Sequence, residues 1–211
     1  MSNYDLQQSS VEFQLMVSLL RLPTQPEIES NVQHLMSQKP DWSQFVKLAI
    51  RHKVVPQLYG TLDAASKSIW PSETRDTLKR VYLRNSKRAM IRCAATVEIL
   101  KRFEEVGIQG LALKGPPLAL WAYGDVSHRF AGDLDLFVDA RQAQLAELTV
   151  EESGYKNITA GLRFRDRLKH HTAHAEFKSD RLDLTLELHW RLTHHRLLPF
   201  DLANLISRSQ N

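Results

Sequence analysis

The stretch "RFAGDLDLFV", residues 129–138, places two aspartates one residue apart inside an otherwise apolar run. Acidic and apolar residues alternate here, which predicts a β-strand with one buried face. Asp133 and Asp135 are therefore expected to project from the same face of that strand. Two neighbouring carboxylates repel each other unless a cation neutralises them. The pattern therefore has two interpretations: the solvated face of an amphipathic strand, or a site for Mg²⁺ or Mn²⁺, which both accept carboxylate ligands.

A second alternating stretch, "RLDLTLELHW" (181–190), follows "HAEFKS" (174–179), and the two are separated by a Ser-Asp turn. This arrangement predicts a β-hairpin. Four leucines share one face of the second strand, and the other face carries Asp183, Thr185, Glu187 and His189. If this strand neighbours the first one, Glu187 or Asp183 joins the two aspartates. His189 then either hydrogen-bonds a ligating carboxylate or is an ordinary core histidine.

The segment before the aspartates reads as a strand followed by a short helix. "IQGLALKG" (108–115) is apolar and ends in glycine, and "PPLALWAYG" (116–124) carries proline in its first turn. A helix that begins after Lys114 and Gly115 offers free backbone N–H groups to an anion. Lys114 supplies a positive charge, and Gly115 permits close approach of a phosphate.

The first half of the chain has helical periodicity. Helices are expected over 11–22, 40–55 and 71–107, with Asp41 as a candidate N-cap of the second and a turn at "PQLYGTL" (56–62). Strands and helices then alternate, including a helix over 140–154, and another helical pattern starts in "FDLANLISRSQN" (200–211). The sequence predicts an N-terminal helical region, residues 1–105, followed by an α/β core, residues 106–211.

These motifs together resemble the uncharacterised nucleotidyltransferase family of the polymerase-β-like superfamily. The resemblance rests on Leu113-Lys114-Gly115, Arg129, Asp133-Leu134-Asp135 and the later "LELHWRL" (186–192), and it extends from about residue 10 to about 195. It implies an α+β fold in which a polymerase-β-like nucleotidyltransferase core with a small mixed sheet follows an N-terminal helical region.

The resemblance also implies an activity. A member of this family is expected to transfer a nucleoside monophosphate from an NTP such as ATP to a hydroxyl of an acceptor, with Mg²⁺ or Mn²⁺ as cofactor. It assigns metal binding and catalysis to Asp133, Asp135 and Glu187, and nucleotide contacts to Lys114, Gly115 and Arg129. Glu187 is preferred to Asp183 because it precedes the His-Trp pair of the family's second motif. A small molecule, a peptide, a protein and RNA all remain open as the acceptor.

Two alternatives stay open. The wider superfamily usually has Gly-Gly or Gly-Ser at the strand end, close to its acidic pair. In this chain the phosphate-binding serine is missing, and residues 116–132 separate Gly115 from Asp133. These departures favour a catalytically degenerate binding or regulatory module. The second alternative is a glycosyltransferase that uses Asp-x-Asp to hold the metal of a nucleotide sugar, against which the Lys114–Gly115 turn and the second acidic strand both argue.

Composition narrows the class of protein. The chain has 211 residues, 43% of them hydrophobic, one cysteine, and a formal net charge of +4. A single cysteine excludes an internal disulfide framework, and no apolar run is long enough to span a bilayer. The N-terminus shows no signal-peptide pattern, so we expect a cytoplasmic protein without a membrane partner.

Two further features carry less weight. The basic runs within 71–107 and at "RFRDRLKHH" (163–171) are expected to be mainly solvated faces, with RNA binding as the alternative. His170 and His174 have the spacing of a helical zinc site, but no cysteine accompanies them, and a solvated or phosphate-facing cluster is the preferred interpretation.

Overall fold

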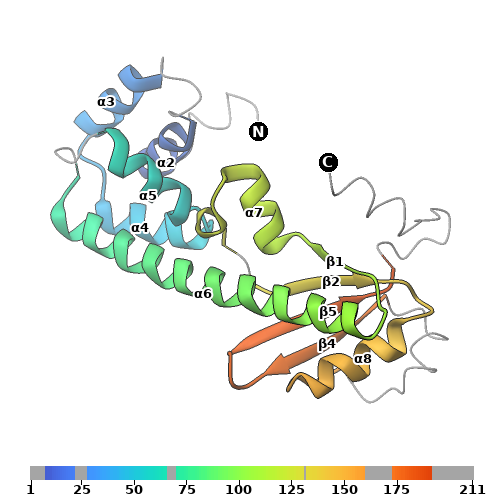
Figure 1. Ribbon diagram of the computed structural model, residues 1–211. Helices are drawn as coiled ribbons and strands as arrows, with labels where there is room; N and C mark the ends of the chain where they lie inside the picture. Colours follow the sequence, from blue (N-terminus) through green and yellow to red (C-terminus); the bar gives the residue numbers. More distant parts are fainter. Residues whose placement is uncertain (1–7, 22–27, 66–69, 131, 160–172, 192–211) are drawn as a thin grey trace. The chain divides into compact units, whose positions relative to one another are not determined.

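The computed structural model describes residues 8–21, 28–65, 70–130, 132–159 and 173–191 (Figure 1). The helices are α2 (Val11–Arg21), α3 (Glu29–Ser37), α4 (Trp42–Arg51), α5 (Val55–Ala65), α6 (Ser72–Glu105), α7 (Gly115–Tyr123) and α8 (Ala143–Glu152), with a short 3₁₀ turn, η2 (Val126–His128). The strands are β1 (Gly110–Leu113), β2 (Leu134–Val138), β3 (Lys156–Asn157), β4 (His174–Ser179) and β5 (Leu184–His189). The predicted α+β class with a helical N-terminal region and a mixed sheet is confirmed.

The described chain forms two compact units, and the division between them falls inside α6. One unit contains the described residues up to Arg88 together with Ser127–Phe130, and the other contains Ala89–Val126 and the described residues from 132 onward. The sequence pattern placed the boundary near residue 105, at the end of the long helical stretch. Packing changes earlier than the helix ends, because the two halves of α6 contribute side chains to two separate cores.

The helical unit is built from amphipathic helices around an apolar core. Its fully buried side chains include Leu15 of α2, Phe45 of α4, Leu58 of α5 and Leu78 of α6. The start of α4 is capped as the sequence predicts: a carboxylate oxygen of Asp41 accepts hydrogen bonds from two backbone N–H groups of the first turn, at 2.9 and 3.2 Å.

Two helices of this unit differ from the sequence-based expectation. The turn expected after Pro56 is instead α5, which begins at Val55. Proline lacks a backbone N–H, but the N–H groups of a helix's first turn have no hydrogen-bond partner within the helix. Pro56 is therefore compatible with the first turn of α5. Helix α3 was not predicted because its apolar stripe is short: only Val32 and Leu35 are buried within it.

The sheet unit has the strand order β1-β2-β5-β4-β3, with β2 and β5 parallel and every other pair antiparallel. One face of the sheet is apolar and is covered by α8 and the second half of α6 (Figure 1). That core contains alternate residues of the two central strands together with residues of the helices: Leu134, Leu136, Val138, Leu184, Leu186, Leu188, Ala95, Ile99, Phe103, Ala143, Ala146 and Val150.

The predicted hairpin is confirmed, with one correction to its second strand. Strands β4 and β5 pair from Ser179 opposite Leu184 to His174 opposite His189. Asp183 does not lie on β5: it belongs to the connecting turn, at φ 49°, and is exposed. The two-residue strand β3 was not predicted, since it is too short to show a period.

Some predictions fall outside the described residues, namely the basic run at 163–171, His170, and the helical pattern after residue 200. Within the part of the chain that the structure describes, no helix is both long enough and apolar enough to cross a bilayer.

The short segment before β2 is anchored to α6 within the helical unit. Asn85 is 3% exposed, and its amide nitrogen donates hydrogen bonds to the carbonyl oxygens of Ser127, at 2.8 Å, and Arg129, at 3.3 Å. These bonds join residues more than forty positions apart in the chain. They hold residues 127–129 against α6 within the helical unit.

Substituting Leu186→Ala should lower the free energy of unfolding by about 2–5 kcal/mol, because it leaves a cavity at a fully buried position of the central strand β5. Urea denaturation followed by circular dichroism measures this change. Leu148→Ala is the matched control, since Leu148 is 50% exposed on α8 and should change stability by less than about 0.5 kcal/mol. Equal effects of the two substitutions would contradict the assigned core.

Substituting Asn85→Leu should cost about 1–3 kcal/mol of stability, because the buried carbonyl group of Ser127 and the partly buried one of Arg129 lose their donor. The control is Ser86→Ala on the next residue, whose hydroxyl only donates within its own helix, to the carbonyl oxygen of Tyr82. Urea denaturation measures both variants. If Asn85→Leu were as stable as the wild-type protein, the Asn85 side chain would not hold the segment before β2.

Candidate metal and nucleotide site

The parallel pairing of β2 with β5 brings the two acidic strands together. Asp135 lies opposite Glu187, and Phe137 lies opposite His189. The leucines of both strands face the core, so the alternate positions project together from the other face. The sequence predicted this meeting only on the condition that the strands are neighbours, and the structure shows that they are.

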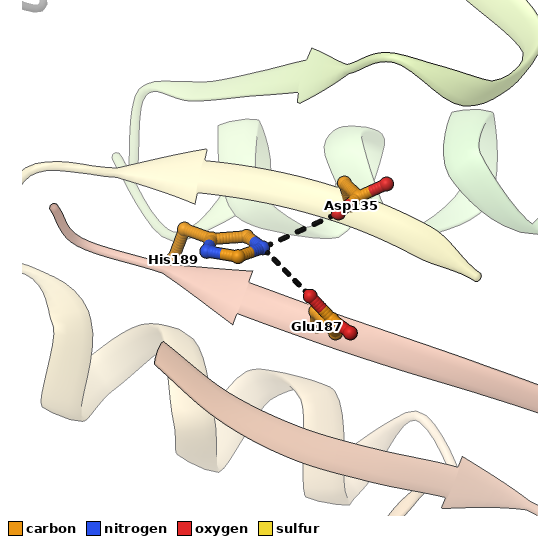
Figure 2. Close-up of side chains that lie close together, drawn as sticks. All are labelled: Asp135, Glu187 and His189. Carbon is orange, nitrogen blue, oxygen red and sulfur yellow. Dashed lines mark hydrogen bonds and ion pairs between the residues drawn. The ribbon is translucent and has the colours of Figure 1, made fainter. Parts of the chain in front are cut away.

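Three side chains converge at this point: Asp135, Glu187 and His189 (Figure 2). The Nε2 atom of His189 lies 3.3 Å from Oδ1 of Asp135 and 3.1 Å from Oε2 of Glu187. The three side chains are 10%, 26% and 15% exposed, respectively. One donor atom from each lies within 4.8 Å of the other two, and this donor set of two carboxylates and an imidazole fits a divalent cation.

The imidazole of His189 is held neutral by its surroundings. Burial, followed by electrostatic repulsion from the neighbouring His174, lowers the pKa of His189 below its ordinary value of 6.5. The carboxylates of Glu187 and Asp135 oppose this shift but do not overcome it. At neutral pH the two carboxylates therefore lack a cationic histidine between them, and the cluster keeps a negative charge.

The turn between β1 and α7 adds a cation to the same carboxylate. The Nζ atom of Lys114 lies 3.3 Å from Oδ1 of Asp135, and its side chain is 62% exposed. Lys114 and Gly115 have φ of 52° and 44°. A positive φ is uncommon for lysine, and backbone strain of this kind gathers at ligand-binding sites. Gly115 begins α7, whose first N–H groups have no partner within the helix.

Asp133 lies outside the three-residue cluster. It is an exposed residue in the bend before β2, which begins at Leu134. The alternation of "DLDL" led us to expect Asp133 and Asp135 side by side, but a strand's period does not extend past the strand's first residue. The backbone carbonyl of Asp133 does lie near the Lys114–Gly115 turn, 4.0 Å from the position a Cβ atom would take on Gly115.

Arg129 belongs to the helical unit, where its carbonyl oxygen accepts the hydrogen bond from Asn85. Its proposed contact with a phosphate stays a prediction.

Arg92 belongs to the basic run within 71–107, which was expected to be mainly a solvated face, but the residue is 7% exposed. Its Nε and Nη2 atoms donate to the carbonyl oxygen of Gly132, at 3.2 and 2.9 Å, directly before Asp133. The sequence spacing could have indicated this burial. Arg92 falls three residues after the buried Ala89 and seven before the buried Ile99, which places it on the same face of the helix as both.

His174 supports the cluster from the neighbouring strand. It pairs with His189 across β4 and β5, and the two ring centroids are 5.1 Å apart. The Nε2 atom of His174 lies 3.5 Å from Oε1 of Glu176 on its own strand. His174 is a strand residue, so it does not take part in the helical zinc motif considered from its spacing with His170.

Comparison with protein-family models gives a match over residues 38–211 to a family described as uncharacterised nucleotidyltransferase. This range covers most of the chain and includes the Lys114–Gly115 turn and both acidic strands. No curated protein and no solved structure matches the chain. With the family model extending over both acidic strands and the glycine turn between β1 and α7, the chain belongs to this nucleotidyltransferase family.

Proposed function

We propose that this protein is a metal-dependent nucleotidyltransferase that moves a nucleoside monophosphate from an NTP to a hydroxyl group of an acceptor. The observation that carries the proposal is the convergence of Asp135 and Glu187 beside Lys114, in a chain that belongs to a nucleotidyltransferase family. A pair of carboxylates suits Mg²⁺ or Mn²⁺, and a cation at a helix start suits phosphate.

In this proposal Asp135 and Glu187 hold the metal, which when bound neutralises charge on the phosphates and the leaving group. Lys114 and the first N–H groups of α7 hold the triphosphate. Asp133 stays a prediction as a further ligand. Arg92 is a positioning residue, because it fixes the carbonyl of Gly132 at the entry to the acidic strand.

The transfer itself exchanges one bond to phosphorus for another. The acceptor oxygen forms a bond to the α-phosphorus, and the bond from the α-phosphorus to the bridging oxygen breaks. Pyrophosphate leaves with the electron pair, and the hydroxyl proton passes to the carboxylate of Glu187 and then to water. The protein contributes mainly orientation and a fixed charge pattern, which supply most of the rate in reactions of this type.

Substituting Asp135→Asn should weaken NTP binding in the presence of Mg²⁺ or Mn²⁺ by at least about tenfold, because it removes a ligating charge while keeping the side chain's shape. Isothermal titration calorimetry with each of the four NTPs, with and without the metal, measures the effect. Asp180→Asn is the matched control. Asp180 lies in the exposed turn between β4 and β5, where it forms an ion pair with Lys156 of β3.

Wild-type protein that binds no NTP under either condition would contradict the proposal. Metal-dependent NTP binding without pyrophosphate release, across small-molecule, peptide, protein and RNA acceptors, would reject transfer and favour the binding or regulatory alternative.

Substituting Lys114→Met should change the affinities for the metal and for the NTP in different ways. Without nucleotide, the metal affinity should stay the same or rise, because the ammonium group that competes for Oδ1 of Asp135 is gone. NTP affinity in the presence of the metal should fall, because a phosphate partner is lost. Lys101→Met, at an exposed position of α6, is the control. Weaker metal binding by Lys114→Met in the absence of nucleotide would contradict this role.

A further inference from the structure

The contacts of His189 differ from those of a simple supporting histidine. A single atom, Nε2, lies within 3.3 Å of oxygens from two different carboxylates. An imidazole nitrogen carries either one hydrogen or one lone pair, so it serves as donor to one oxygen or as ligand to one metal. Three donor atoms facing a common point suit one shared cation better than two separate hydrogen bonds.

The ring of His189 is held in place before any ligand arrives. The side chain is only 15% exposed, and its ring packs against His174 at a centroid distance of 5.1 Å with planes 39° apart. Both histidines sit on paired strands in direct register. A donor that is already oriented loses little conformational freedom on binding, as metal ligands generally require.

Asp133 is the competing third ligand, and the described structure favours His189. Asp133 is exposed in the bend before β2, and it is not among the three residues whose donor atoms meet. Asp135 and Glu187 are common to both alternatives. The two possible donor sets therefore differ in one atom: a third carboxylate oxygen or an imidazole nitrogen.

We propose that His189 Nε2 is the third protein ligand of this site, and that the site consequently prefers a first-row transition-metal dication to Mg²⁺. The inference rests on the proposed metal-dependent function and adds the class of metal to it. Mg²⁺ binds oxygen and keeps much of its water, whereas imidazole nitrogen raises affinity for the transition metals. Three protein donors also leave coordination positions for oxygens of the substrate.

The test measures Mn²⁺ bound to the full chain without nucleotide, by electron paramagnetic resonance with Mg²⁺ as competitor. Mn²⁺ is the probe because it accepts carboxylate oxygen as Mg²⁺ does but accepts imidazole nitrogen more readily. The nitrogen ligand is therefore reported by how differently His189→Gln changes the two affinities. Wild-type protein should bind Mn²⁺ more tightly than Mg²⁺. His189→Gln should lose at least about tenfold in Mn²⁺ affinity and much less in Mg²⁺ affinity.

Two further variants complete the test: Asp133→Asn decides between the competing third ligands, and His34→Gln is the control. Asp133→Asn should keep most of the Mn²⁺ affinity, because Asp133 lies outside the cluster. His34→Gln makes the same chemical change in helix α3 of the other unit and should bind Mn²⁺ as wild type does.

A spectroscopic readout keeps the test independent of whether His189→Gln folds. In wild-type protein, electron spin echo modulation of bound Mn²⁺ should show coupling to ¹⁴N, and this coupling should change when the histidines carry ¹⁵N. Bound Mn²⁺ without nitrogen coupling, or a loss in Asp133→Asn as large as that in His189→Gln, would overturn the assignment of His189.

The assignment and the proposed function fail in different ways. A protein that binds Mn²⁺ through nitrogen but neither binds NTP nor transfers a nucleotide retains the metal assignment and loses the transferase. A protein that transfers nucleotides with Mn²⁺ held only by oxygen retains the transferase and loses the role of His189. Absence of any divalent-ion binding would overturn both.

Discussion

The parallel register of β2 against β5 is the constraint on which the site depends. These strands are separated by about fifty residues of sequence, yet Asp135 lies directly opposite Glu187. The leucines on the other face of both strands fix this register, since a slip of one residue would turn them into solvent and carry the acidic residues into the core. The same burial that stabilises the sheet therefore aligns the carboxylates.

Charge balance around this pair explains the surrounding residues. Two carboxylates at a largely shielded position face a histidine that burial keeps neutral, so the cluster retains negative charge. Lys114 offsets part of it from the strained turn between β1 and α7. Because the side chain of Lys114 is mostly exposed, solvent weakens its attraction to Asp135. A more strongly bound cation can therefore replace the lysine at that carboxylate. In the proposed function, a metal ion would displace Lys114 from Asp135 and leave the lysine available to a phosphate.

Local sequence patterns predicted most of the helices and strands. They failed where one residue type is compatible with two different structural roles. The long helix, the capped start of α4 and the β4–β5 hairpin follow from periodicity and from Asp41. Pro56 was interpreted as the start of a turn, but proline is equally common in the first turn of a helix, which is its position in α5. Arg92 was interpreted as a surface cation, but a long side chain on the buried stripe of a helix can instead satisfy a buried carbonyl, here that of Gly132.

The sequence by itself determined the alternating strands, the Asp-x-Asp pair, the Lys-Gly turn and the acidic residue before His-Trp, because each depends only on neighbours along the chain. Tertiary structure decided which of these groups meet. It joined Asp135, Glu187 and His189, left Asp133 in an exposed bend, and placed Asp183 in a turn. The reason is physical: the period of a strand orients side chains only within that strand, whereas its ends and its partners are set by non-local burial and pairing.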